Sequence, residues 1–156
     1  MKKIKILGVL LICLIVNISC SDNDTNVKLS DKQNLTKKTW IFKNFKFLDS
    51  SNNSKKYTSE DFENVVDNNY NELSLEFNEN GEGFVTRKTK TTVKFTWELT
   101  NDKLKIVIPN PAESSDDVHT YTISVSDSQL ALTMTEEFVV FINGDELGAK
   151  GIQYYK

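Results

Sequence analysis

The dominant pattern along most of the chain is an alternation of apolar and polar residues with a period of two. From about residue 35 onward it recurs in five clear stretches, at residues 72–77, 93–99, 103–108, 120–125 and 130–135. Successive side chains of a strand point to opposite faces of a sheet, so each stretch predicts a strand with one buried and one solvated face. Short segments rich in Asn, Asp, Ser and Gly separate these stretches. Links of this length force successive strands to pair antiparallel.

The first strand, predicted over residues 39–48, changes phase halfway. Its aromatic residues are Trp40, Phe42, Phe45 and Phe47. In a regular strand the first two would point to one face and the last two to the opposite face. A bulge near Asn44 would bring all four rings to one face and would bend the strand. The alternative is a strand buried on both faces, against which Lys43 and Lys46 argue.

A single helix is predicted, in the long segment between the first two strands. Thr58 or Ser59 can cap it, and Phe62 forms an apolar pair with Val65 or Val66 at a spacing of three or four residues. Two interpretations stay open for this segment. It covers one end of the fold like a lid, or it is a polar loop whose one amphipathic turn packs on the rim.

Eight or nine strands in simple succession predict an all-β, antiparallel up-and-down barrel, closed or half-open, over residues 35–156. Closure removes the strand edges that an all-β protein must otherwise protect. An eight-stranded barrel is filled by side chains or holds one small ligand. If a cavity exists, its lining is expected to come from the inward aromatics, with the two tryptophans near its floor. These residues are Trp40, Phe42, Phe77, Phe95, Trp97 and Tyr121. Filling of the core is the alternative role for the same rings.

Residues 138–142 form an apolar run on both faces of a predicted strand. An outward apolar face is unusual for a barrel strand. We expect it to be covered by the tail, residues 151–155. A docking strand for a protein partner is the alternative.

The start of the chain has the pattern of a secretion signal. Three lysines, at positions 2, 3 and 5, precede an eleven-residue run, residues 6–16, that is apolar apart from one glycine. A membrane-spanning helix needs about 20 residues, so this run predicts a signal peptide rather than an anchor. The run ends in Asn17-Ile18-Ser19-Cys20, which resembles the lipobox of bacterial lipoproteins. The chain is therefore divided into a signal peptide at 1–19, a lipidated Cys20 with a polar tether at 20–34, and a barrel domain at 35–156.

Charge and composition exclude several classes of function. Without residues 1–19 the net charge changes from −3 to −6, with 16 basic and 22 acidic residues. Nucleic acid is not an expected partner, because phosphates demand a basic footprint. The domain holds a single histidine, His119, which is expected on the barrel rim. No catalytic residue, metal site or cofactor is predicted, and we do not expect an enzyme, because a nucleophile triad or a zinc site needs more partners than this one imidazole.

A family resemblance rests on the order of several motifs. Leu35-x-x-x-x-Trp40 is followed by Leu73-Ser-Leu-Glu-Phe77, Phe95-Thr-Trp97 and Tyr121-Thr-Ile123. Behind a lipobox, this order resembles the lipocalin-like domain of Bacteroidetes lipoproteins. The resemblance implies a barrel on a lipid anchor, in the bacterial outer membrane on its periplasmic face or at the cell surface. The aromatics add the hypothesis of a small hydrophobic ligand. The alternative is an interaction or structural protein of the cell envelope with a filled core, whose protein partner the sequence does not name.

The lipobox predicts how the whole chain partitions. Cys20→Ala should move it from the detergent-rich to the aqueous phase of Triton X-114, because the attachment point of the acyl chains is lost. The matched control is Cys13→Ala, which should leave partitioning unchanged, because the bulky Ile12 makes position 13 a poor cleavage site. Membrane partitioning by the Cys20→Ala chain would contradict the assignment.

Overall fold

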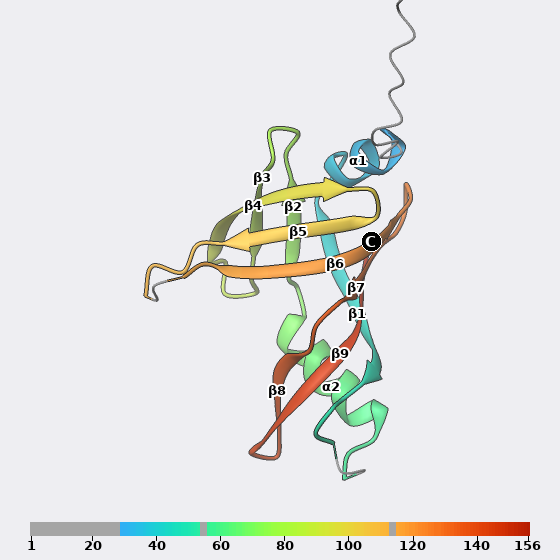
Figure 1. Cartoon of the computed structure of the whole chain (residues 1–156), viewed down its shortest axis with the longest axis vertical. Coiled ribbons are helices and arrows are strands. Elements are labelled where there is room, and N and C mark those ends of the chain that lie inside the picture. The colour runs from blue at the N-terminus through green and yellow to red at the C-terminus, as the bar shows by residue number, and fades with distance from the viewer. Residues whose placement is uncertain (1–28, 54–55, 113–114) are drawn as a thin grey trace, which may run out of the picture.

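The computed structural model describes residues 29–53, 56–112 and 115–156 (Figure 1). Cys20, the predicted signal peptide and most of the predicted tether lie outside these residues. None of the helices in the described ranges is long and apolar enough to cross a membrane. The elements are α1 (Leu29–Thr36), β1 (Trp40–Asp49), α2 (Ser59–Tyr70), β2 (Ser74–Phe77), β3 (Glu82–Thr86), β4 (Thr92–Thr100), β5 (Lys103–Ile108), β6 (Asp117–Val125), β7 (Leu130–Met134), β8 (Phe138–Ile142) and β9 (Asp145–Tyr155).

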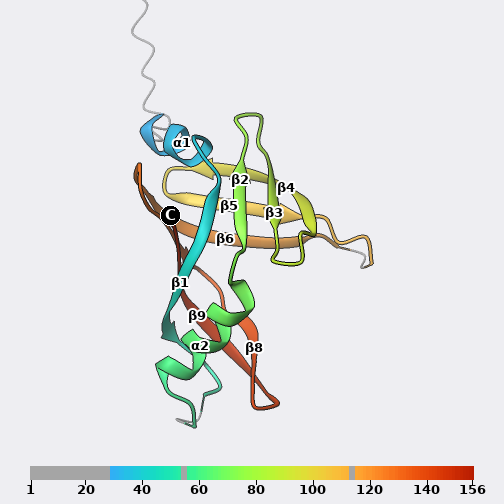
Figure 2. The ribbon, with the colours of Figure 1, turned by 180° about the vertical axis from the view of Figure 1, so that it is seen from behind.

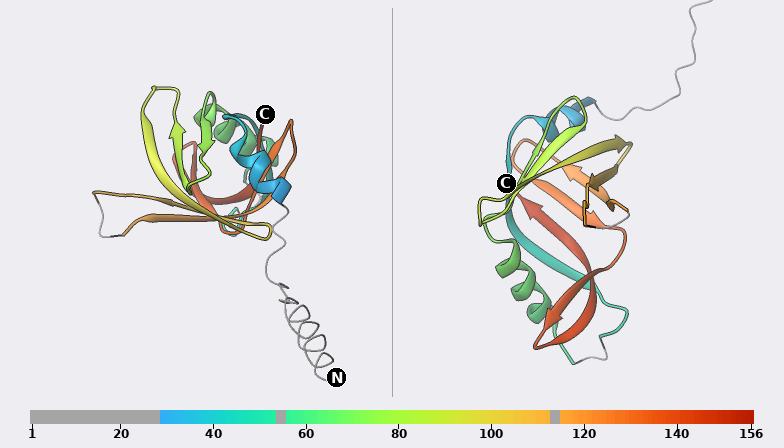
Figure 3. Two further views of the ribbon diagram at one scale, coloured as in Figure 1. Left: turned by 90° about the horizontal axis from the view of Figure 1, so that it is seen from above. Right: turned by 90° about the vertical axis from the view of Figure 1, so that its left-hand side faces the viewer.

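Eight of the strands close into an antiparallel barrel, as the alternating pattern predicts. β1 to β7 are neighbours in chain order, β9 pairs with β7, and β9 also pairs with β1 to complete the ring. Seen along another axis, the strands surround a common interior (Figure 3). The expected simple succession fails only at the end of the chain, where β9 takes the place beside β7 and β8 lies outside the barrel. The all-β antiparallel barrel is therefore confirmed, in its closed form.

β9 serves two different sheets along its length. Its second part pairs with β1 and β7 inside the barrel, and its first part pairs with β8 in a hairpin. The hairpin turn is Asn143-Gly144, and both residues have positive φ, as a tight two-residue turn requires. This turn places Asp145–Ala149, rather than residues 151–155, beside β8. The expected cover of β8 by the tail is therefore wrong, and Val139 and Phe141 are 56% and 61% exposed.

The phase change of β1 is a bulge, as predicted. The register between β1 and β9 shifts between Phe42 and Asn44, and both Phe42 and Phe45 are buried. Beyond the bulge β1 leaves β2 and continues with β9 below the barrel. There, side chains of α2 accept the backbone hydrogen bonds that β2 no longer accepts. Asp67 Oδ1 accepts from the Phe45 backbone N–H at 2.6 Å, and Glu63 Oε1 accepts from the Phe47 backbone N–H at 3.0 Å.

The predicted helix forms, with Thr58 as its N-cap. Thr58 and Asp61 make a reciprocal capping box. Val66 and Phe62 are buried, and the ring of Phe62 stacks on Phe47 with centroids 4.3 Å apart. α2 packs against β1 and β8, beside the part of the sheet that extends beyond the barrel (Figure 2).

A second helix, α1, contradicts the prediction of only one and includes part of the predicted tether. Its sequence has little helical periodicity, so its position depends on tertiary contacts. The fully buried Leu35 offers its carbonyl oxygen to the indole N–H of Trp40 at 2.9 Å. Lys37 then forms an ion pair with Asp127 in the β6–β7 hairpin at 2.9 Å. α1 thereby covers one end of the barrel.

Barrel closure requires glycine where β9 passes β1. A Cβ on Gly151 would overlap the ring of Phe45 and the backbone oxygen of Lys46. Gly151→Ala should therefore destabilise the domain by about 1–3 kcal/mol, as overpacking typically does. Denaturant unfolding measures the change. The matched control on the same strand is Gly148→Ala, which meets only the flexible side chain of Glu137 and should cost less than about 0.5 kcal/mol. Equal losses in the two variants would contradict this account of closure.

Candidate functional site

The barrel interior contains a cavity of about 420 Å³. Its walls come from β2 to β7 and β9, with further residues from the end of α2 and the start of β8. Nine of the nineteen lining residues are apolar. The apolar residues are Leu73, Leu75, Val85, Phe95, Ile106, Ile108, Leu132, Met134 and Phe138. They face one another because the period of two turns every second side chain of each strand inward.

The mouth of the cavity lies among polar residues, away from α1. Tyr70 and His119 are half-buried there, and the ring of His119 stacks on Tyr121 with centroids 6.4 Å apart. His119 thus lies at the rim, as expected. Among the described residues, Arg87 forms no ion pair, whereas Lys88 lies 3.8 Å from Glu72. The exposed lining residues are Asn69, Asn71, Arg87, Lys88 and Asp117.

The predicted aromatic residues divide into two groups. Phe95 and Tyr121 line the cavity. Trp40, Phe42, Phe77 and Trp97 are buried but do not line it, so the expectation of tryptophans at the cavity floor is not met.

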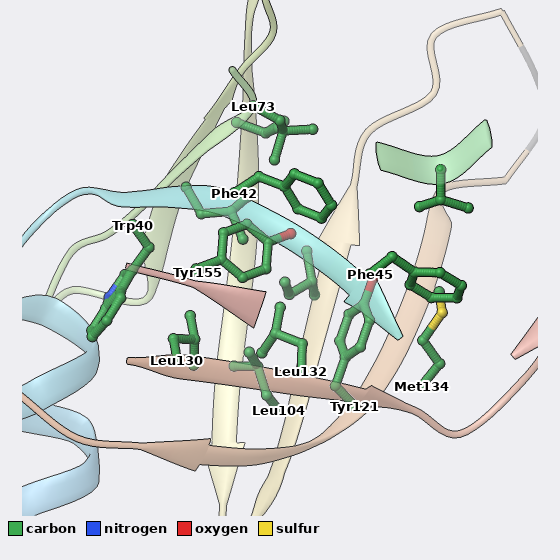
Figure 4. Close-up of a cluster of buried hydrophobic side chains, with 14 of the residues drawn as sticks. Trp40, Phe42, Phe45, Leu73, Leu104, Tyr121, Leu130, Leu132, Met134 and Tyr155 are labelled. Atoms are coloured by element: carbon green, nitrogen blue, oxygen red, sulfur yellow. The ribbon is translucent and has the colours of Figure 1, made fainter. Parts of the chain in front are cut away.

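Those four rings fill space instead. The Phe77 ring lies edge-on to Phe95 and Trp97 at 5.4 and 5.5 Å, and the indole N–H of Trp97 donates to the Glu82 carbonyl oxygen at 2.9 Å. Figure 4 shows Trp40 beside the α1 end of the cluster, apart from Phe42. Phe42 packs against Tyr70 and Tyr155 of the cavity lining, whereas Trp40 and Trp97 contact α1 at the other end, so only part of the interior is hollow.

Three polar side chains interrupt the apolar wall: Tyr121, Gln153 and Tyr155. Apart from the tyrosines, Gln153 is the only buried residue with a polar side chain among the described residues, with 3% of its surface exposed. The hydroxyl of Tyr155 donates to Gln153 Oε1 at 2.8 Å. This pair was not predicted, because residues 151–155 were expected to cover β8. The alternation in the sequence does place Gln153 on the same strand face as the apolar Leu147 and as Tyr155, which could have indicated an inward position.

Burial controls the protonation of the tyrosines around the cavity. Loss of hydration raises the pKa of Tyr121 and Tyr155 well above the ordinary value, and each of these phenols is further raised by a neighbouring tyrosine. Loss of hydration also raises the pKa of Tyr70, against a smaller lowering by Arg87. The hydroxyls inside the cavity therefore stay neutral at physiological pH.

No cluster of three His, Cys, Asp or Glu side chains that could hold a metal ion occurs in the described ranges. In comparisons with known proteins, the chain matches no family model, no curated protein and no solved structure. The chemistry of the site therefore has to be inferred from its geometry. That geometry is an apolar chamber with a few neutral polar groups inside and charged groups at its mouth.

The raised tyrosine pKa values predict a pH dependence of stability. The folded chain keeps its phenol protons at pH values where the unfolded chain loses them, above about pH 10. The contribution of these tyrosines to stability should therefore be constant below that pH and be lost as the pH rises toward the folded values. Tyr121→Phe should make this fall shallower by up to about 1.4 kcal/mol per pH unit. Urea unfolding between pH 8 and 11.5 measures the slope, and an unchanged slope would contradict the burial of this hydroxyl.

Proposed function

We propose that the barrel binds one small, mainly apolar molecule in its interior. The observation that carries the proposal is the cavity itself. Its volume of about 420 Å³ lies in the range of small-molecule sites, about 300–1,000 Å³. Apolar walls with a few placed polar groups are also typical of such sites. A wholly filled core, the alternative in the sequence, would leave no chamber of this size.

The proposal includes a lipid anchor at Cys20 in the bacterial cell envelope, in the outer membrane. The lipobox and the short apolar run at the start of the chain support it. The closed barrel is also compatible with the lipocalin-like domain that the motifs resemble. An anchor at Cys20 would join the barrel through α1, at the packed end. The mouth would then face away from the anchored end and be open to a ligand.

A second candidate function is protein docking on β8. Val139 and Phe141 are exposed side by side on one face of this strand, while Val140 and Ile142 are buried beneath it. Within the described part of the chain, β8 pairs only with β9, so its other edge is unpaired. Strands with such edges can accept a further strand from a partner. The cavity favours the first candidate, because an exposed edge alone specifies no ligand.

Binding in the cavity can be tested with the fluorescent apolar probe N-phenyl-1-naphthylamine. The native domain should bind it with increased emission. Ile108→Trp replaces an aliphatic side chain of the lining near the mouth with a larger indole ring. It should weaken binding at least about tenfold, equivalent to about 1.4 kcal/mol. Fluorescence titration measures the affinity.

The matched control is Val118→Trp. Val118 lies on the neighbouring strand, is 51% exposed and faces outward. This variant adds an indole of the same size outside the barrel and should bind the probe as the native domain does. No binding to the native domain, or equal weakening in both variants, would count against a ligand in the interior.

A further inference from the structure

The cavity wall contains an amide group that lacks a partner. Gln153 is almost completely buried, and its Oε1 already accepts the hydrogen bond from Tyr155. Its Nε2 donates no hydrogen bond to any described residue. In the described ranges, every side-chain nitrogen or oxygen that is fully enclosed by protein has a hydrogen-bond partner. Nε2 has no such partner, so it is not fully enclosed. Because Gln153 lines the cavity, an Nε2 atom that is not sealed in protein is available to the chamber.

The hydroxyl of Tyr121 is a second donor of the same kind. Tyr121 is 9% exposed, and its ring forms part of the cavity wall. Its Oη makes no hydrogen bond within the described residues, and it too is not fully enclosed. Loss of hydration raises the pKa of this hydroxyl, so it keeps its proton. Two neutral donors on different strands, β6 and β9, thus face one apolar chamber.

We propose that the ligand of this cavity is an apolar molecule that carries a neutral oxygen acceptor, such as a ketone or ester carbonyl. Gln153 Nε2 donates to this oxygen, and Tyr121 Oη is the second donor. The inference rests on the proposed binding function and names the chemical class of its ligand. Tyr155 has a positioning role, because its hydroxyl holds Gln153 Oε1 and leaves the amide nitrogen for the ligand.

Two other ligand classes fit the wall less well. A pure hydrocarbon would displace water from both donors and leave them unpaired, which is unfavourable for buried polar groups. An ionised carboxylate at this depth would need a cation beside it. The three polar side chains inside are neutral, and Arg87 and Lys88 lie exposed at the mouth. A neutral carbonyl group matches both constraints.

The test uses three probes of similar size on the complete chain: 2-ethylnaphthalene, 2-acetylnaphthalene and 2-naphthoate. Their affinities are measured by displacement of N-phenyl-1-naphthylamine. The native chain should bind the ketone about three- to tenfold more tightly than the hydrocarbon, the effect of one hydrogen bond. Gln153→Met keeps the side-chain length without the donor and should lower this ratio. Tyr121→Phe removes only the hydroxyl and should lower the ratio as well.

The control is Tyr57→Phe. This hydroxyl donates to the Ile142 carbonyl oxygen and to Asp145 outside the cavity, so its loss should leave the ratio unchanged. Because Tyr121→Phe changes one atom, it tests the inference even if Gln153→Met fails to fold.

Three outcomes would overturn the assignment. Equal affinities for the ketone and the hydrocarbon would refute the polar class while leaving the binding function intact. A native preference for the ketone that persists in both Gln153→Met and Tyr121→Phe would show that other groups provide it. Tightest binding of 2-naphthoate, lost in Arg87→Gln, would assign an anionic ligand held at the mouth. Failure of all three probes and of N-phenyl-1-naphthylamine to bind would instead refute the proposed function itself.

Discussion

The pairing of β9 with both β1 and β7 is the interaction on which the rest of the structure depends. It turns a row of strands into a closed ring and so fixes an interior of limited width. Two local features permit it. The bulge after Phe42 bends β1 toward β9, and Gly151 leaves room for the ring of Phe45 at the point of contact. Because β9 continues beyond the barrel, the same strand also holds β8, and with β1 this extension supports α2.

Closure alone does not decide whether the barrel is filled or hollow. The distribution of side-chain volume along the barrel axis decides it. At one end Trp40 and Phe77 are fully or almost fully buried, and the buried Leu35 of α1 accepts the hydrogen bond from the Trp40 indole. Toward the other end the wall is mainly aliphatic, with residues such as Leu75 and Leu132, which reach less far into the interior than indole rings do. The exposed lining residues lie at the end of α2, in the β3–β4 loop and at the start of β6.

Local patterns predicted the elements that depend on local physics. The period of two predicted β2, β4, β5, β6 and β7, the parity change in β1 predicted its bulge, and Thr58 predicted the helix cap. Features set by distant contacts were not predictable in this way. α1 depends on the bond between Leu35 and the indole of Trp40, and the position of β9 depends on which strand closes the ring. Alternation also shows which side chains point inward but not how far away the opposite wall lies, so Phe95 and Trp97 could not be separated into lining and filling residues.

Gln153 is the residue that most supports the proposal of a binding site in the interior. An amide in a mainly apolar wall costs more to bury than an apolar residue of similar volume, even where its unpaired end is not sealed in protein. Its neighbours on the inward face of β9 are Ala149, Gly151 and Tyr155, of which only Tyr155 carries a polar group, and that group is committed to Gln153. The fold thus holds one end of the amide in a fixed position and leaves the other end available to the chamber. Packing requirements do not account for this arrangement, and the proposed recognition of an oxygen acceptor within an apolar molecule would use the free end of the amide.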